Sequence, residues 1–164
     1  MTTIYLDLDG VFADFDYGVY RACGQLPSQL EANAMWSVVS KVPGFYRNLP
    51  KTEYAARLYW AISKMAFHYK ADVKILTALP RTSTYPTARE EKQQWVYENL
   101  GKLEVLSTVG SANKWKYATL GGILIDDKPD NINDWLDKPN FLTKAVLHDP
   151  AHWNKTITYL QELL

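Results

Sequence analysis

Five short apolar runs recur along the chain, and each ends in a turn or in polar residues. Such runs predict β-strands. Helical patterns lie between them, and strands that alternate with helices are typical of a parallel sheet covered on both faces. We therefore expect an α/β protein with a parallel five-stranded sheet. The predicted strands are Ile4–Leu8, Val73–Ala78, Leu103–Thr108, Ile123–Ile125 and Lys144–His148.

Two helices are predicted between and after these strands. Residues 86–100 begin with proline, carry two early glutamates and are followed by Gly101, which is the usual order of helix signals. Residues 150–164 follow Asp149, a suitable N-cap, and repeat apolar side chains at spacings of four, three and four. These apolar residues are Trp153, Ile157, Leu160 and Leu164.

Residues 15–70 interrupt the alternation, because they contain no convincing strand. They include a helical pattern over Thr52–Tyr69 and the turn-rich stretch VPGFYRNLP. The insertion follows the carboxyl end of the first strand, the edge at which open α/β sheets bind ligands. We predict a helical cap subdomain over 15–70, placed on a Rossmann-like core of 1–14 and 71–164.

Composition narrows the classes of function. A hydrophobic fraction of 47% is that of an ordinary globular protein, and 18 basic residues balance 18 acidic ones without a basic block. A grip on a nucleic-acid polymer needs such a block, so we expect none, whereas a single nucleotide remains compatible. Cys23 is the only cysteine, which excludes an intrachain disulfide. A strand begins within three residues of Met1 and no long apolar run occurs, so we expect a cytoplasmic protein without membrane contact.

The first predicted strand runs into Asp7, Asp9 and Gly10. Residues two apart on an extended segment point the same way. Two carboxylates repel each other by about 1 kcal/mol at about 4 Å in water and by about 4 kcal/mol at an effective dielectric of about 20. A hard cation such as Mg²⁺, or a shared proton, relieves this repulsion. Glycine permits a tight turn and a close approach to a ligand.

A second acidic cluster, Asp126, Asp127 and Asp130, follows the fourth predicted strand. If the first and fourth strands are neighbours, the two clusters meet and form a metal site with a spare carboxylate. Asp127 and Asp130 could equally serve the N-terminus of a following helix.

Two further residues would suit a phosphate group near these carboxylates. Thr77, at the end of the second strand, offers a hydroxyl and a backbone amide, and Lys114 offers a point charge. Lys116, two residues on, is an alternative to Lys114.

These segments resemble, in order, the four motifs of the haloacid-dehalogenase-like phosphohydrolase superfamily: DLDGVFAD, Thr77, Lys114 and LIDDKPD. Within it the chain resembles the 5′(3′)-deoxyribonucleotidases, on Val11 and Asp14 and on the stretches PGFYRNLP and EKQQWVYENLG. Ala78 departs from the pattern, because a small hydroxyl residue is expected after Thr77. One phosphate hydrogen bond is then lost or replaced.

The resemblance implies a Mg²⁺-dependent hydrolysis of deoxyribonucleoside monophosphates. Asp7 would be the nucleophile and Asp9 the general acid and base. Asp7, the backbone carbonyl of Asp9 and Asp126 would hold Mg²⁺. Asp127 and Asp130 would support the metal ligands, and Thr77, Ala78 and Lys114 would bind the phosphate.

The predicted cap is rich in aromatic residues. Phe15, just past the first motif, is expected to line a base and deoxyribose pocket together with Trp36, Phe45 or Tyr46, since bases stack on aromatic rings. The alternative is that these rings form the core of the cap. Asp14 has a similar alternative as a capping residue.

Other functions remain open on the same fold. One is a phosphatase acting on another small phosphomonoester or on a nucleic-acid 3′-phosphate, and another is a non-catalytic nucleotide-binding module. The G-x-x-x-x-G-K-[ST] motif of P-loop kinases does not occur. Base preference, 5′ or 3′ preference, and the choice between monomer and homodimer also stay open.

Overall fold

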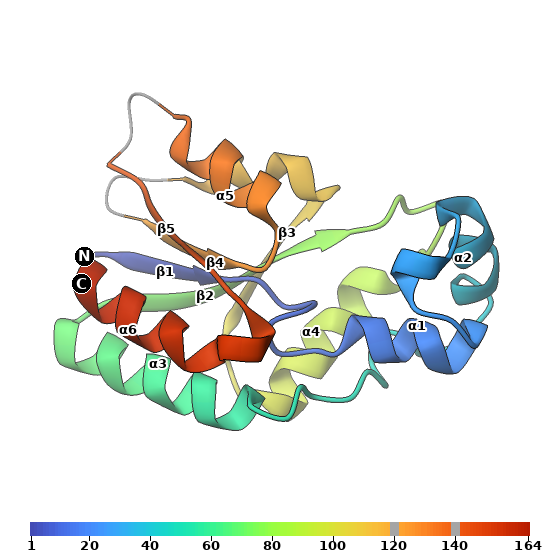
Figure 1. Cartoon of the computed structure of the whole chain (residues 1–164), viewed down its shortest axis with the longest axis horizontal. Helices are drawn as coiled ribbons and strands as arrows, with labels where there is room; N and C mark the ends of the chain where they lie inside the picture. The colour runs from blue at the N-terminus through green and yellow to red at the C-terminus, as the bar shows by residue number, and fades with distance from the viewer. Residues whose placement is uncertain (119–121, 139–141) are drawn as a thin grey trace.

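The five predicted strands are present and form one all-parallel sheet in the order β3-β2-β1-β4-β5 (Figure 1). The computed structural model describes residues 1–118, 122–138 and 142–164. Each strand begins and ends within two residues of its prediction, and β1 lies between β2 and β4, so the first and fourth strands are neighbours. The strands are β1 (Thr3–Leu6), β2 (Asp72–Leu79), β3 (Glu104–Val109), β4 (Ile123–Asp126) and β5 (Lys144–Leu147).

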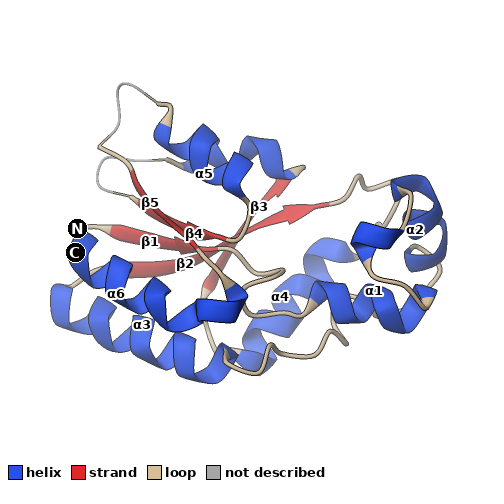
Figure 2. Cartoon of the chain, in the orientation of Figure 1, coloured by secondary structure: helices blue, strands red, loops and turns tan. Residues whose placement is uncertain are grey.

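Helices cover both faces of the sheet (Figure 2), as the alternation predicts. On one face, Ile4 and Leu6 of β1 belong to a core with α3 (Ala55–Tyr69), α4 (Ala88–Asn99) and α6 (Trp153–Leu163). On the other, Tyr5 packs with α5 (Pro129–Leu136) and the 3-10 helix η2 (Ser111–Tyr117). Alternate strand residues therefore bury themselves in opposite layers, which is the arrangement of an α/β fold.

Two helices lie past the carboxyl ends of the strands, away from the sheet (Figure 1). They are α1 (Phe15–Cys23) and α2 (Ala32–Val39), with the short 3-10 helix η1 (Pro27–Gln29) between them. The insertion thus follows β1 as expected. α3, which the sequence placed in the same cap, packs instead against β2 and α6 beneath the sheet. The subdomain boundaries themselves stay a prediction.

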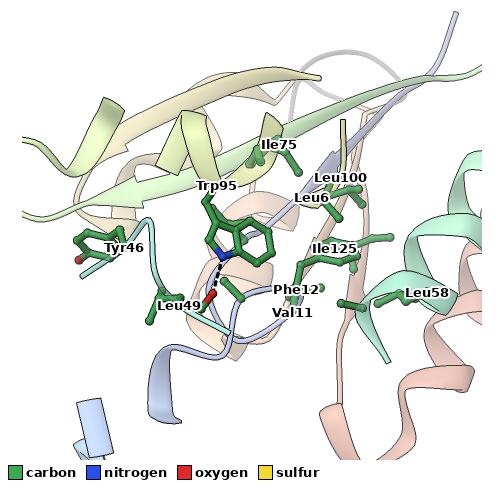
Figure 3. Close-up of a cluster of buried hydrophobic side chains, with 14 of the residues drawn as sticks. Leu6, Val11, Phe12, Tyr46, Leu49, Leu58, Ile75, Trp95, Leu100 and Ile125 are labelled. Atoms are coloured by element: carbon green, nitrogen blue, oxygen red, sulfur yellow. Dashed lines mark hydrogen bonds between the residues drawn. The ribbon is translucent and has the colours of Figure 1, made fainter. Parts of the chain in front are cut away.

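A buried indole ties the insertion to the core. Trp95 of α4 is 1% exposed, and its Nε1–H donates a 2.8 Å hydrogen bond to the carbonyl of Leu49 (Figure 3). Buried tryptophan N–H groups need such a partner. The turn-rich stretch before α3 is thereby held against α4.

The 3-10 helix η3 (Pro150–His152) precedes α6. None of the helices in the described residues is long and apolar enough to cross a membrane.

Candidate active site

The two acidic segments meet at the carboxyl edge of the sheet. The Asp7 N–H donates to the carbonyl of Ile125 at 2.9 Å, so the first residue after β1 still lies alongside β4. Asp7, Asp126 and Asp127 each offer a carboxylate oxygen, and these oxygens lie within 4.8 Å of one another. Three carboxylates at this spacing can hold a metal ion. The neighbouring first and fourth strands bring the clusters together as the sequence predicts.

Lys114 joins this group from η2. Its ammonium lies 2.6 Å from Asp7 Oδ1 and 2.6 Å from Asp126 Oδ2, and the side chain is buried. Lys116 is exposed. The structure therefore brings Lys114, and not Lys116, to the carboxylates.

Asp126 is held by the start of α5 as well. The Asn131 side-chain amide donates to Asp126 Oδ2 at 2.9 Å, and the Lys128 N–H donates to Oδ1 at 2.9 Å. Asp130, the residue that the sequence analysis named as a supporting acid, lies exposed in the first turn of α5. An acid there favours the helix N-terminus, which was its alternative role. Asn131 was not predicted, because an asparagine beside three aspartates carries no signal of its own.

The three carboxylates of Asp7, Asp126 and Asp127 are accompanied by one ammonium, that of Lys114. Burial raises the pKa of Asp7 to about 7, although Lys114 opposes the shift, and burial with the Asp126 charge raises the pKa of Asp127 to about 6. Burial alone would lower the pKa of Lys114, but Asp7 and Asp126 raise it. Asp127 Oδ1 is buried and has no hydrogen-bond partner among the described residues. One ammonium does not satisfy three carboxylates, so the group suits a further cation.

Asp9 faces different partners from Asp7, which corrects the expectation that their side chains point the same way. β1 ends at Leu6, so the alternation of an extended strand does not reach Asp9. Asp9 Oδ2 lies 2.6 Å from the Lys92 ammonium, which also donates to Thr77 Oγ1 at 3.1 Å and to the Ala78 carbonyl at 2.6 Å. Asp9 Oδ1 is buried without a partner among the described residues.

Lys92 is a second residue that the sequence analysis missed. It is 2% exposed and comes from the middle of α4. A signal existed, since Ala88, Lys92, Trp95 and Val96 share the buried face of this helix. A lysine at an apolar position of an amphipathic helix is seldom buried without an acidic partner.

Gly10 lets the loop after β1 approach Asp127 closely. Its φ is +83°, a left-handed conformation that favours glycine, and a Cβ there would lie 2.3 Å from Asp127 Oδ2. The glycine thus serves contact with the second acidic segment as well as the turn.

A cavity of about 730 Å³ opens beside these groups. Asp9, Lys92 and Asp127 line it with charged side chains, Ala78 lies beside them, and Phe15, Trp36 and Tyr46 line it with aromatic rings. Phe45 is not among its lining residues in the described part of the chain. It is buried behind the wall, with its ring 5.7 Å from that of Phe15. Asp14 lines the cavity and also caps α1, since it accepts the Tyr17 N–H at 3.0 Å.

Comparison with known proteins establishes no family for this chain. No protein-family model matches the chain, and no curated protein matches it. Among solved structures, a chain in the Pnkp1/Rnl/Hen1 complex aligns with a TM-score of 0.49 and 12% sequence identity, over 88% of this chain and 45% of that one. The chain therefore spans less than half the length of that neighbour. The superfamily resemblance of the motifs stays a prediction, and the chain is an α/β protein with a cluster of acids able to hold a metal ion.

Proposed function

We propose that the protein is a metal-dependent phosphomonoesterase whose substrates are deoxyribonucleoside monophosphates. The observation that carries this proposal is the meeting of Asp7, Asp126 and Asp127 beside two buried lysines, Lys114 and Lys92. Phosphoryl transfer needs little beyond a positioned nucleophile and cations around the transferring group. This site offers both at the edge of an aromatic cavity.

The donor set fits Mg²⁺ better than a softer metal, because it contains only oxygen atoms. Asp7, Asp126 and Asp127 would hold the ion. Asp127 Oδ1, which has no hydrogen-bond partner among the described residues, would then be satisfied by the metal. A ligand role for the Asp9 backbone carbonyl stays part of the proposal. When bound, the ion would supply positive charge against the phosphate oxygens.

Two carboxylates would then divide the chemistry. An oxygen of Asp7 attacks phosphorus, the phosphorus–ester bond breaks, and the leaving sugar oxygen takes a proton from Asp9. In the second step Asp9 takes a proton from water, which attacks the aspartyl-phosphate and releases phosphate and the free Asp7 carboxylate. The separate ion pairs of Asp7 with Lys114 and of Asp9 with Lys92 are consistent with two different roles.

The lysines and the cavity wall would bind the substrate. Lys92 contacts both Thr77 and Ala78, so its positive charge lies beside the residues expected to bind the phosphate. Phe15 and Trp36, both half-buried in the wall, offer faces on which a nucleobase can stack, worth about 1–3 kcal/mol.

Phosphate release from a panel of phosphomonoesters, with Mg²⁺ and with chelator, tests the proposal. The panel contains deoxy- and ribonucleotides as 5′ and 3′ isomers, several sugar phosphates and a 3′-phosphorylated oligonucleotide. We expect chelator-sensitive release concentrated on deoxyribonucleoside monophosphates. Asp7→Asn should abolish it, whereas Asp134→Asn, an exposed acid on α5, should leave it intact.

The other outcomes separate the alternatives. Release concentrated on a sugar phosphate or the oligonucleotide would keep the chemistry and reject the substrate. Silence across the panel, with nucleotide binding retained, would favour a binding module. Normal turnover by Asp7→Asn would reject the nucleophile.

A further inference from the structure

The turn-rich segment 42–47 is fastened to the core by two side chains that the catalytic proposal does not use. The Tyr85 hydroxyl accepts the Phe45 N–H at 2.9 Å and lies 2.8 Å from the Val42 carbonyl oxygen. It also lies 3.2 Å from both carboxylate oxygens of Glu91, so its one proton is shared among three acceptors. Tyr85 is buried, with 4% of its surface exposed.

Glu91 continues the same attachment from the first turn of α4. Its Oε2 accepts the Tyr46 N–H at 3.0 Å and the Arg47 N–H at 3.4 Å, and the Thr87 hydroxyl donates to its Oε1 at 2.8 Å. Together with Tyr85 it satisfies three consecutive amides of a segment without regular structure. Such amides need partners when they are buried, and hydrogen bonds to a carboxylate are the stronger kind.

The attachment ends at a side chain of the cavity wall. The Tyr46 ring lines the cavity and stacks on Phe15, with 6.4 Å between centroids and 24° between planes. The Lys92 ammonium lies 4.6 Å from its centroid, a cation–π distance. Adjacent residues of α4 therefore hold the two ends of Tyr46, since Glu91 binds its amide and Lys92 faces its ring.

We infer that Tyr85 and Glu91 are positioning residues, which place Tyr46 against Phe15 and thereby set the affinity for the substrate's aromatic base. Neither side chain lines the cavity among the described residues, so both act through Tyr46. The inference rests on the proposed function for its substrate. It assigns to the pair an effect on binding and none on the phosphoryl-transfer step.

The kinetic test uses Tyr85→Phe and Glu91→Ala, with Glu91→Gln as the conservative variant. A base that stacks on Phe15 loses part of its stacking when Tyr46 no longer supports that ring. We therefore expect KM for a deoxyribonucleoside monophosphate to rise about 5- to 20-fold. The kcat for this substrate should stay within about twofold, because neither Tyr85 nor Glu91 lines the cavity. Loss of a catalytic group would lower kcat far more. Both constants for glycerol 2-phosphate, which has no ring, should be unchanged. Glu91→Gln keeps one acceptor oxygen and should lie between wild type and Glu91→Ala.

Glu90→Gln, the exposed neighbour on α4, is the matched control and should behave as wild type. Equal losses on both substrates, or a fall in kcat with KM unchanged, would overturn the positioning role. If Glu91→Ala does not fold, Tyr85→Phe carries the test, since it removes one oxygen atom only.

Hydrogen–deuterium exchange of the intact protein tests the attachment without a substrate. We expect the amides of residues 45–47 to exchange at least tenfold faster in Tyr85→Phe and Glu91→Ala than in wild type, and those of β1 to be unchanged. Unchanged exchange at 45–47 would overturn the attachment itself. If these amides exchange faster in the variants but the protein hydrolyses no nucleotide, the attachment of residues 45–47 by Tyr85 and Glu91 stands and the proposed function fails. That outcome would overturn the assignment to base affinity alone.

Discussion

Replacing Lys92 with methionine keeps an unbranched side chain one atom shorter and removes the ammonium that contacts Asp9, Thr77 and Ala78. Breaking a fully buried ion pair by removing one partner costs about 3–5 kcal/mol, because the other charge stays buried alone. The Asp9 side chain is 25% exposed and borders the cavity, so water can reach it. An unsatisfied group of this kind costs about 1–3 kcal/mol. We therefore expect Lys92→Met to lower the free energy of unfolding by about 2 kcal/mol.

Urea denaturation in the presence of a chelator measures this change without a contribution from bound metal. At an m-value of about 2 kcal/mol/M, the midpoint should fall by about 1 M. Lys116→Met, which removes an exposed lysine, is the matched control and should shift it little. Under the proposed function, hydrolysis by Lys92→Met should also fall about 10²- to 10³-fold.

A double-mutant cycle with Asp9→Asn attributes the effect to the pair. Once Asp9 is neutral, no buried charge remains to be left alone, so Lys92→Met should cost less in that background by about 1 kcal/mol or more. A midpoint for Lys92→Met equal to that of wild type would refute the reasoning. So would an equal cost in the two backgrounds.

Three shorter predictions concern the same edge of the sheet. Gly10→Ala should destabilise the protein by about 1–3 kcal/mol in urea, because φ is +83° and the new Cβ meets Asp127; a neutral change would contradict the close approach. Burial lowers the pKa of His148 to about 4. The neutral imidazole therefore contributes stability above about pH 6.5, and this contribution is lost as the pH falls towards 4. His148→Asn should flatten that part of the dependence of the unfolding free energy on pH. Because the pKa values of Asp7 and Asp127 are raised to about 7 and about 6, metal binding at pH 6 should release protons, which calorimetry in two buffers detects as a buffer-dependent heat.

The strands could be predicted from the sequence because each is a local pattern. The short apolar run of β4, bounded by polar residues, is typical of a buried strand, and the acids that follow it then lie at the carboxyl edge. The meeting of Asp7 with Asp126 required one further fact, that β1 and β4 are neighbours, and alternation alone does not establish it. The observed order supplies that fact.

The packing of α3 shows where local patterns stop. Its helix was predicted, but its partner was not, because an apolar face states only that something covers it. Leu58 and Ile62 are fully buried with the sheet residues, so this face belongs to the layer beneath β2. In the same way Phe45, grouped with the ligand-binding aromatics on sequence, lies behind the cavity wall among other rings.

The division between Asp7 and Asp9 depends on residues far away in the sequence, which is why no motif could show it. Two carboxylates two residues apart would share one cation if both followed the strand. Because β1 ends before them, Asp7 faces Lys114 from η2 while Asp9 faces Lys92 from α4. Each carboxylate thus has an ammonium of its own beside it, which offsets the repulsion estimated from the sequence. Under the proposed function Asp7 and Asp9 have different roles, and two separate ion pairs would give the two carboxylates the different surroundings that these roles need.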